Sequence, residues 1–143
     1  MTVAITKPTL SKAAASFLTK ELKMLIDGKW VAAASGKTFP VEDPATQEIV
    51  AHVPEGTKED IDRAVKAARK AFESGPWPKL SPAERAKLVW RLGDLLEQHA
   101  DELAELESVD NGKPFNSARK GDLPGSYGMF RYMSGWCQRL TGE

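Results

Sequence analysis

The stretch Met24-Leu25-Ile26-Asp27-Gly28-Lys29-Trp30-Val31 marks where ordered structure is expected to begin in this chain. Two apolar runs flank an Asp-Gly pair, which readily takes the positive backbone angles of a two-residue turn. The stretch therefore predicts a short β-hairpin. A second pair of strands is predicted at residues 38–41 and 48–53, because Asp43-Pro44-Ala45-Thr46 between them has the composition of a turn.

Helix signals follow these strands. Thr57 is a predicted amino-terminal cap before an acidic first turn, and Ser81-Pro82-Ala83-Glu84 combines a capping box with proline at the first helical position. Apolar residues recur at helical spacing after both starts, with a break or bend expected near Asp101. Asn111-Gly112-Lys113-Pro114 predicts a helix end. A last helix is predicted from about residue 116 to 139, strained around Pro124.

Composition narrows the classes of function. Basic and acidic residues both number 20 in 143, so no broad electrostatic field favours nucleic acid or anionic lipid. No apolar run approaches the roughly 20 residues that a membrane span needs. The single cysteine, Cys137, can form neither an internal disulfide nor a thiolate metal site by itself. We therefore expect a cytoplasmic protein that binds neither nucleic acid nor membrane.

Residues 1–24 differ in composition from the rest of the chain. They are rich in Ser, Thr, Ala and Lys and contain no arginine, which argues against an organellar presequence without removing that alternative. We expect a floppy or weakly helical arm at residues 1–24 and the folded portion at residues 25–143.

The predicted strands are too few and too short to cover the apolar faces of the predicted helices. Several helices have apolar faces, but two short hairpins make a poor core, since isolated strand pairs are marginal in water. No alternating strand and helix series supplies a central sheet. The helices are therefore expected to pack against a body encoded elsewhere.

Five segments, in order, resemble the amino-terminal region of NAD(P)-dependent aldehyde dehydrogenases, and the resemblance runs from Leu25 to the end. They are residues 25–30, 39–46, 64–72, 110–114 and 130–136. Residues 123–126 and 129–133 most resemble phenylacetaldehyde dehydrogenase-like members of the family. The resemblance implies an α/β fold. This chain would form the amino-terminal part of its cofactor-binding domain, which would be truncated. Short β-hairpins would be followed by three or four helices, incomplete without the remaining sheet.

The resemblance implies that a full-length enzyme would oxidise an aldehyde to a carboxylic acid with NAD or NADP. That chemistry uses a cysteine thiolate, a glutamate that activates water, and a glycine-rich turn for the dinucleotide. The chain contains no G-x-G-x-x-G turn, and Cys137 lies outside the family's catalytic context. His52 and His99 have no partner in the sequence that would complete a catalytic relay. No catalytic or cofactor-binding residue is therefore assigned, and the chain alone is expected to be inactive and to bind no cofactor.

Two lesser sites follow from the resemblance. The carbonyls of Val41 and Glu42 with Asp110 match a structural monovalent cation site, although Asp110 could equally belong to a helix-terminal turn. Gly121 and Gly125 match a wall of the substrate tunnel, where absent side chains would admit a bulky aldehyde, including an aryl-substituted one. The alternative is that both glycines permit close packing. The resemblance also implies that the full-length enzyme is a homo-oligomer. The competing interpretation of the chain is a non-catalytic interaction or scaffold module.

Overall fold

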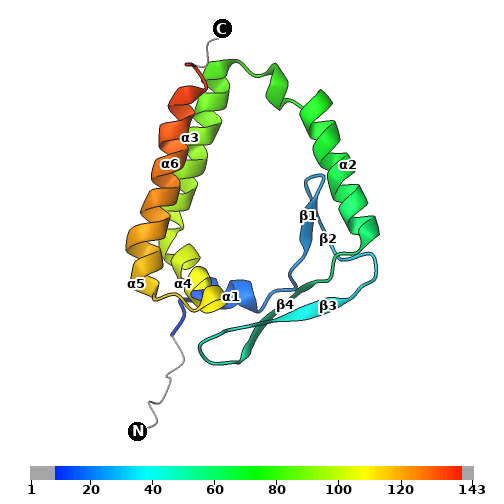
Figure 1. Cartoon of the computed structure of the whole chain (residues 1–143), viewed down its shortest axis with the longest axis vertical. Coiled ribbons are helices and arrows are strands. Elements are labelled where there is room, and N and C mark those ends of the chain that lie inside the picture. Colours follow the sequence, from blue (N-terminus) through cyan, green and yellow to red (C-terminus); the bar gives the residue numbers. More distant parts are fainter. Residues whose placement is uncertain (1–8, 140–143) are drawn as a thin grey trace.

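The computed structural model describes residues 9–139 (Figure 1). The elements in order are α1 (Lys12–Leu18), β1 (Met24–Ile26), β2 (Lys29–Val31), β3 (Thr38–Glu42), β4 (Ile49–Pro54), α2 (Lys58–Ser74), a 3-10 turn η1 (Trp77–Lys79), α3 (Pro82–Gln98), α4 (Ala100–Asn111), α5 (Phe115–Ser117), a π-helical turn η2 (Ala118–Asp122) and α6 (Leu123–Trp136). This order confirms the predicted succession of short strand pairs and then helices. Within residues 9–139, no helix combines the length and apolar content that a membrane crossing requires.

Each hairpin forms its own two-stranded antiparallel sheet. In the first, Asp27 and Gly28 have φ angles of 52° and 72°, the positive pair predicted for the turn between β1 and β2. The second pairs β3 with β4 and has an irregular register between Val41 and Glu42. Both predicted hairpins are confirmed, with strand ends displaced by one residue in β3 and β4.

A buried carboxylate links the loop after the first hairpin to the start of α2. Asp60 is only 1% exposed, and its oxygens accept hydrogen bonds from the Thr57 backbone N–H at 2.8 Å and the Thr57 hydroxyl at 2.9 Å. They also accept from the Ala34 N–H at 3.0 Å and from the Arg63 guanidinium. Thr57 and Asp60 thus form a capping box at the start of α2, where the predicted amino-terminal cap lies. The backbone hydrogen bond from Thr57, helped by Arg63 and Ala34, holds the pKa of Asp60 far below its usual range.

Helices α3 and α6 lie side by side along most of their length, while α2 stands apart from them (Figure 1). Gly93 of α3 is buried in this contact, where a Cβ atom would lie 3.1 Å from the Tyr127 carbonyl oxygen. The absent side chain therefore allows the two backbones to approach. The Arg131 guanidinium of α6 crosses the same interface and donates to Asp94 at 2.8 Å and Glu97 at 2.6 Å.

The chain between α4 and α6 departs from the predicted single helix over residues 116–139. A short turn α5 is followed by η2, in which the Leu123 N–H donates to the Ala118 carbonyl, five residues earlier. Pro124 explains this wide turn: proline has no N–H, and its ring would crowd the Lys120 carbonyl in a regular α-helix. The earlier break falls at His99, two residues before the predicted Asp101.

The segment predicted as a floppy or weakly helical arm contains α1. The Ser11 hydroxyl caps this helix by accepting from the Ala14 N–H at 3.3 Å, and the Ser11 N–H donates to Glu105 of α4 at 2.9 Å. Ala14 itself is fully buried. Residues 12–18 are therefore ordered against α4, while residues 1–8 lie outside the described part of the chain.

Small residues dominate the interior, and large apolar side chains lie outside. The central cluster consists of Ala100, Ala104, Ala118 and Leu123. By contrast, apolar side chains on α2, α3 and α6 are 39% to 74% exposed; they include Ile61, Val65, Phe72, Leu88, Leu92, Leu95, Met129, Tyr132, Met133 and Trp136. Soluble domains seldom leave large apolar patches uncovered. These faces have the character of packing surfaces.

Candidate functional site

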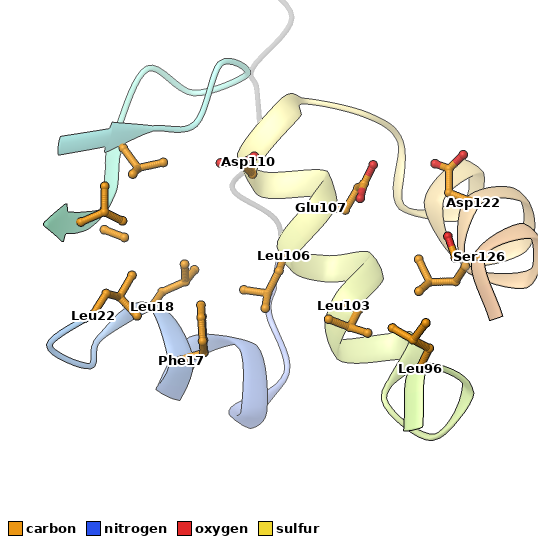
Figure 2. Close-up of a pocket in the computed structure, with 14 residues that line it drawn as sticks. Phe17, Leu18, Leu22, Leu96, Leu103, Leu106, Glu107, Asp110, Asp122 and Ser126 are labelled. Atoms are coloured by element: carbon orange, nitrogen blue, oxygen red, sulfur yellow. The ribbon is translucent and has the colours of Figure 1, made fainter. Parts of the chain in front are cut away.

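A groove of about 490 Å³ separates α1 and the second hairpin from α4 and α6. Figure 2 shows Phe17, Leu18 and Leu22 on one side, opposite Leu103 and Leu106 of α4. The strand residues Val41, Ala51 and Val53 complete the apolar wall, with Leu96 and Leu123. The groove is therefore lined mainly by aliphatic side chains brought together from α1, β3, β4, α3, α4 and α6.

Carboxylates border one end of this groove. Glu107, Asp110 and Asp122 line it (Figure 2), and Lys113 pairs with two of them. The Lys113 Nζ atom is 3.8 Å from a Glu107 oxygen and makes a hydrogen-bonded ion pair with Asp122. The Asp122 hydrogen bond raises the pKa of Lys113. The charge at this end is thus partly neutralised within the chain.

The residues that the resemblance associates with a cation are only partly brought together. Val41 and Asp110 line the same groove, but Glu42, the neighbour of Val41, does not. Within residues 9–139, no group of three or more His, Cys, Asp or Glu side chains could hold a metal ion. Hard cations take about six or more oxygen ligands, so one carboxylate with two carbonyls is an incomplete set. The cation site remains a proposal that requires ligands from elsewhere.

Gly121 and Gly125 lie outside the groove, in different kinds of helix. Gly121 belongs to η2 and Gly125 to the first turn of α6, so they are not in one regular α-helix as predicted. Both are exposed, and a Cβ atom at either would meet nothing within 4 Å. In this chain neither glycine is needed for close packing.

The cysteine and the two histidines lie on different elements of the chain. Cys137 is half-buried just after α6, and His99 at the start of α4 lies 3.4 Å from Glu102. His52 is exposed on β4. A nucleophile needs a base within hydrogen-bond reach. Neither histidine has a hydrogen bond with Cys137 among the described residues.

The starts of α2 and α3, the two 17-residue helices, do not fit a dinucleotide phosphate. An anion binds where amides at a helix amino terminus are free and unopposed by negative charge. At α3 the Glu84 carboxylate accepts from both the N–H and the hydroxyl of Ser81, each at 2.7 Å, and these bonds lower the pKa of Glu84. At α2 the Asp60 carboxylate takes the corresponding place. The starts of α2 and α3 thus already carry a carboxylate.

Two hairpins, a helical pair with exposed apolar faces and a groove without a nucleophile define a structural segment of the α/β class. The model of the aldehyde dehydrogenase family matches residues 30–143, and the chain belongs to that family.

Relatives of known name are considerably longer. Over 120 residues the chain is 52% identical to aldehyde dehydrogenase family 2 member B4, mitochondrial, from Arabidopsis thaliana and to benzaldehyde dehydrogenase, mitochondrial, from Antirrhinum majus. Each match covers 84% of this chain and 22% of the relative. The NAD+ complex structure of aldehyde dehydrogenase from Bacillus cereus is 47% identical with a TM-score of 0.92, covering 96% of this chain and 28% of that one. The chain thus spans about a quarter of these relatives' length.

One residue of structural consequence is missed by sequence reasoning. Arg131 joins α6 to α3, but its partners Asp94 and Glu97 lie 37 and 34 residues away. The one local signal is a charged residue within the largely apolar run 129–133. That signal marks Arg131 as unusual without identifying its partners.

Proposed function

We propose that this chain forms the amino-terminal scaffold of an aldehyde dehydrogenase that oxidises an aldehyde to a carboxylic acid with NAD. The observation that carries the proposal is the α6 stripe, defined as Met129, Tyr132, Met133 and Trp136. These side chains follow helical spacing on one face and are 45% to 64% exposed. Since relatives extend well beyond the matched region, the remainder of such an enzyme is the natural cover for this face.

The roles proposed for this chain and for the rest of the enzyme follow from the side chains that this chain contains. The described residues provide no paired nucleophile and base and no cradle for a dinucleotide, so those parts belong to the remaining polypeptide. This chain supplies a rigid support, in which α3 and α6 are held together around Gly93 and Arg131. The NAD+ complex of the Bacillus cereus relative supports the choice of cofactor.

A chimera tests this role. The chain would be joined to the complementary part of the Bacillus cereus relative, and aldehyde-dependent NADH formation would be followed by absorbance. We expect turnover by the chimera, and none above background by the 143-residue chain alone or by the complementary part alone. Turnover by the purified chain alone would contradict the proposal. A chimera that folds but stays inactive would favour the non-catalytic scaffold interpretation.

We further propose that the enzyme accepts aromatic aldehydes and that Gly125 borders their path. Gly125 precedes Met129 by one helical turn and so lies on the face of the α6 stripe, with open space where a side chain would stand. The benzaldehyde dehydrogenase from Antirrhinum majus supports this substrate class. Gly121, in the preceding turn, is also open and is proposed to border the same path.

Replacing Gly125 with methionine in the chimera should narrow that path. We expect kcat/KM for phenylacetaldehyde to fall roughly tenfold relative to that for acetaldehyde, because a few added methylenes change pocket discrimination by that order. Gly128→Met is the matched control, since Gly128 is equally open but lies off the stripe. An unchanged ratio in Gly125→Met would remove Gly125 from the path. A chimera that remained active with that result would still support the proposed function.

A further inference from the structure

Asn111 and Gly112 stand where α4 ends. Asn111 is the last residue of the helix and is exposed, and Gly112 follows it in the left-handed conformation with a φ of 74°. Because glycine has no Cβ atom, its amide nitrogen is the least hindered nucleophile that can follow an asparagine. The sequence has one other asparagine, Asn116, which precedes the bulkier Ser117. Attack of the following nitrogen on the side-chain amide is therefore sterically easier at Asn111 than at Asn116.

The side chain of Asn111 is held by two hydrogen bonds. Its Oδ1 atom accepts from the Lys113 N–H at 2.8 Å, an Asx turn that folds the side chain back over the Gly112 peptide. Its Nδ2 atom donates to Glu107 at 3.1 Å. A donor on Oδ1 stabilises the negative charge that develops there when the amide carbon is attacked, and a carboxylate beside Nδ2 stabilises positive charge on a departing nitrogen. Both contacts favour the loss of this nitrogen as ammonia.

Two other hydrogen bonds restrain the attacking group. The Gly112 N–H donates to the Ser108 carbonyl at 3.0 Å. The Ser108 hydroxyl donates to the Lys113 carbonyl at 2.6 Å and so closes the same turn. The Gly112 nitrogen cannot turn toward the Asn111 side chain while the first of these bonds is made. Helix ends open at a low cost in free energy, so the restraint delays the attack and does not abolish it.

We propose that Asn111 is a self-modification site, at which opening of the last turn of α4 lets the Gly112 nitrogen convert the asparagine to aspartate or isoaspartate. The Gly112 nitrogen passes its proton to water and bonds to the Asn111 Cγ atom. The bond between Cγ and Nδ2 breaks, and Nδ2 leaves as ammonia with a proton from water. A water molecule then opens the cyclic imide, at Cγ to give aspartate or at the Asn111 backbone carbonyl to give isoaspartate. No atom is oxidised or reduced.

Conversion places a carboxylate where an amide now stands. The new carboxylate would lie against Glu107, whose oxygen is now 3.1 Å from Nδ2, so an attraction becomes a repulsion. Glu107 and Asp110 already line this end of the groove, and Lys113 already pairs with Glu107. Isoaspartate also adds a carbon to the backbone, so the bond from Gly112 to Ser108 cannot re-form in register. Modified chains should therefore have a loosened end of α4.

Mass spectrometry of the 143-residue chain tests the proposal independently of the proposed function, because every group involved lies within residues 107–113. The chain would be kept in mildly alkaline buffer, folded or unfolded by guanidinium, and digested at intervals. Fragmentation separates Asn111 from Asn116 and aspartate from isoaspartate. We expect Asn111 to be converted in both samples, roughly tenfold more slowly in the folded chain, and faster than Asn116 in each.

Two results of this measurement would overturn the proposal. One is an Asn111 that stays intact in the folded chain over a period that converts it in guanidinium. The other is equal conversion of Asn111 and Asn116 in the folded chain.

Two serine variants test whether the last turn of α4 controls the reaction. Ser108→Ala removes the hydroxyl bond to the Lys113 carbonyl, so we expect roughly threefold faster conversion in the folded chain and no change in guanidinium. Ser74→Ala is the matched control, because the Ser74 hydroxyl donates to the Lys70 carbonyl at 3.0 Å at the end of α2. Circular dichroism should show the same helix content in both variants. Equal rates in the two folded variants would show that the turn does not control the reaction and would overturn the proposal.

Discussion

Replacing Asp60 with alanine is expected to lower the thermal midpoint of this chain by on the order of 10 °C. The Asp60 carboxylate is 1% exposed and accepts hydrogen bonds from Thr57, Ala34 and Arg63. Its removal would leave the Thr57 and Ala34 amides without their acceptor and would release the loop after β2 from the start of α2. Thermal unfolding followed by circular dichroism measures the change.

The same carboxylate should make stability depend on pH. The pKa of Asp60 is lower in the folded chain than the value of about 3.9 for an unfolded aspartate. A lowered folded pKa means that the stabilisation is fully present above pH 4 and is lost progressively as the pH falls below it. The difference in midpoint between the wild type and Asp60→Asn should therefore shrink between pH 6 and pH 2.5.

Asp62→Asn is the matched control for both measurements. Asp62 lies on the same helix, but it is exposed and pairs with the exposed Lys58 at 3.0 Å. Exposed pairs of this kind contribute little, so the midpoint should move by less than about 2 °C. Equal effects of Asp60→Asn and Asp62→Asn at pH 6 would show that burial of Asp60 is not what stabilises the chain.

Arg131→Met is expected to produce the second largest loss, a fall in midpoint of roughly 5–10 °C. The guanidinium donates to Asp94 and Glu97, and its carbon atom lies 5.7 Å from the Trp90 ring centre and 5.4 Å from that of Tyr127. The hydrogen bonds that Arg131 donates to Asp94 and then to Glu97 raise the pKa of Arg131. Methionine keeps much of the length and none of the charge, so α3 and α6 would lose their ionic link.

A double-mutant cycle distinguishes this link from general packing. Asp94→Asn should cost much less in the Arg131→Met background than in the wild type, because the partner is already absent. Arg131→Lys should recover only part of the loss, since an ammonium cannot reproduce the flat guanidinium between two rings. Arg91→Met, an exposed arginine on α3, is the control and should change little. Additive effects of Asp94→Asn and Arg131→Met would contradict the ionic link.

Turns and helix ends were predictable because their chemistry is local. Asp27 and Gly28 have the positive φ angles expected of their turn, the Ser81 to Glu84 box forms as predicted, and Gly112 ends α4 with a φ of 74°. Each of these features depends on hydrogen bonds within about four residues. The sequence predicted that Pro124 would strain the last helix. It did not predict the π turn that forms there, because several local geometries can accommodate a proline.

The groove was harder to predict from the sequence than the turns and helix ends. The resemblance pointed to Val41 and Asp110, which do share a groove, but nothing local indicated that α1 would form the opposite wall. The residue types of the groove are ordinary aliphatics, which occur throughout the chain. Their grouping depends on how α1, β3, β4 and α4 are placed relative to one another.

The amino-acid order alone determined the hairpins, the helix starts and stops, the absence of a glycine-rich phosphate turn and the resemblance to a dehydrogenase family. Neighbouring residues decide these features, since a cap or a tight turn closes within one hydrogen-bonded ring. The tertiary structure decided the burial of Asp60 against Ala34, the reach of Arg131 to Asp94 and Glu97, and the ordering of α1 on α4. Those contacts join residues 26 to 94 positions apart, so they exist only once packing has brought distant elements together.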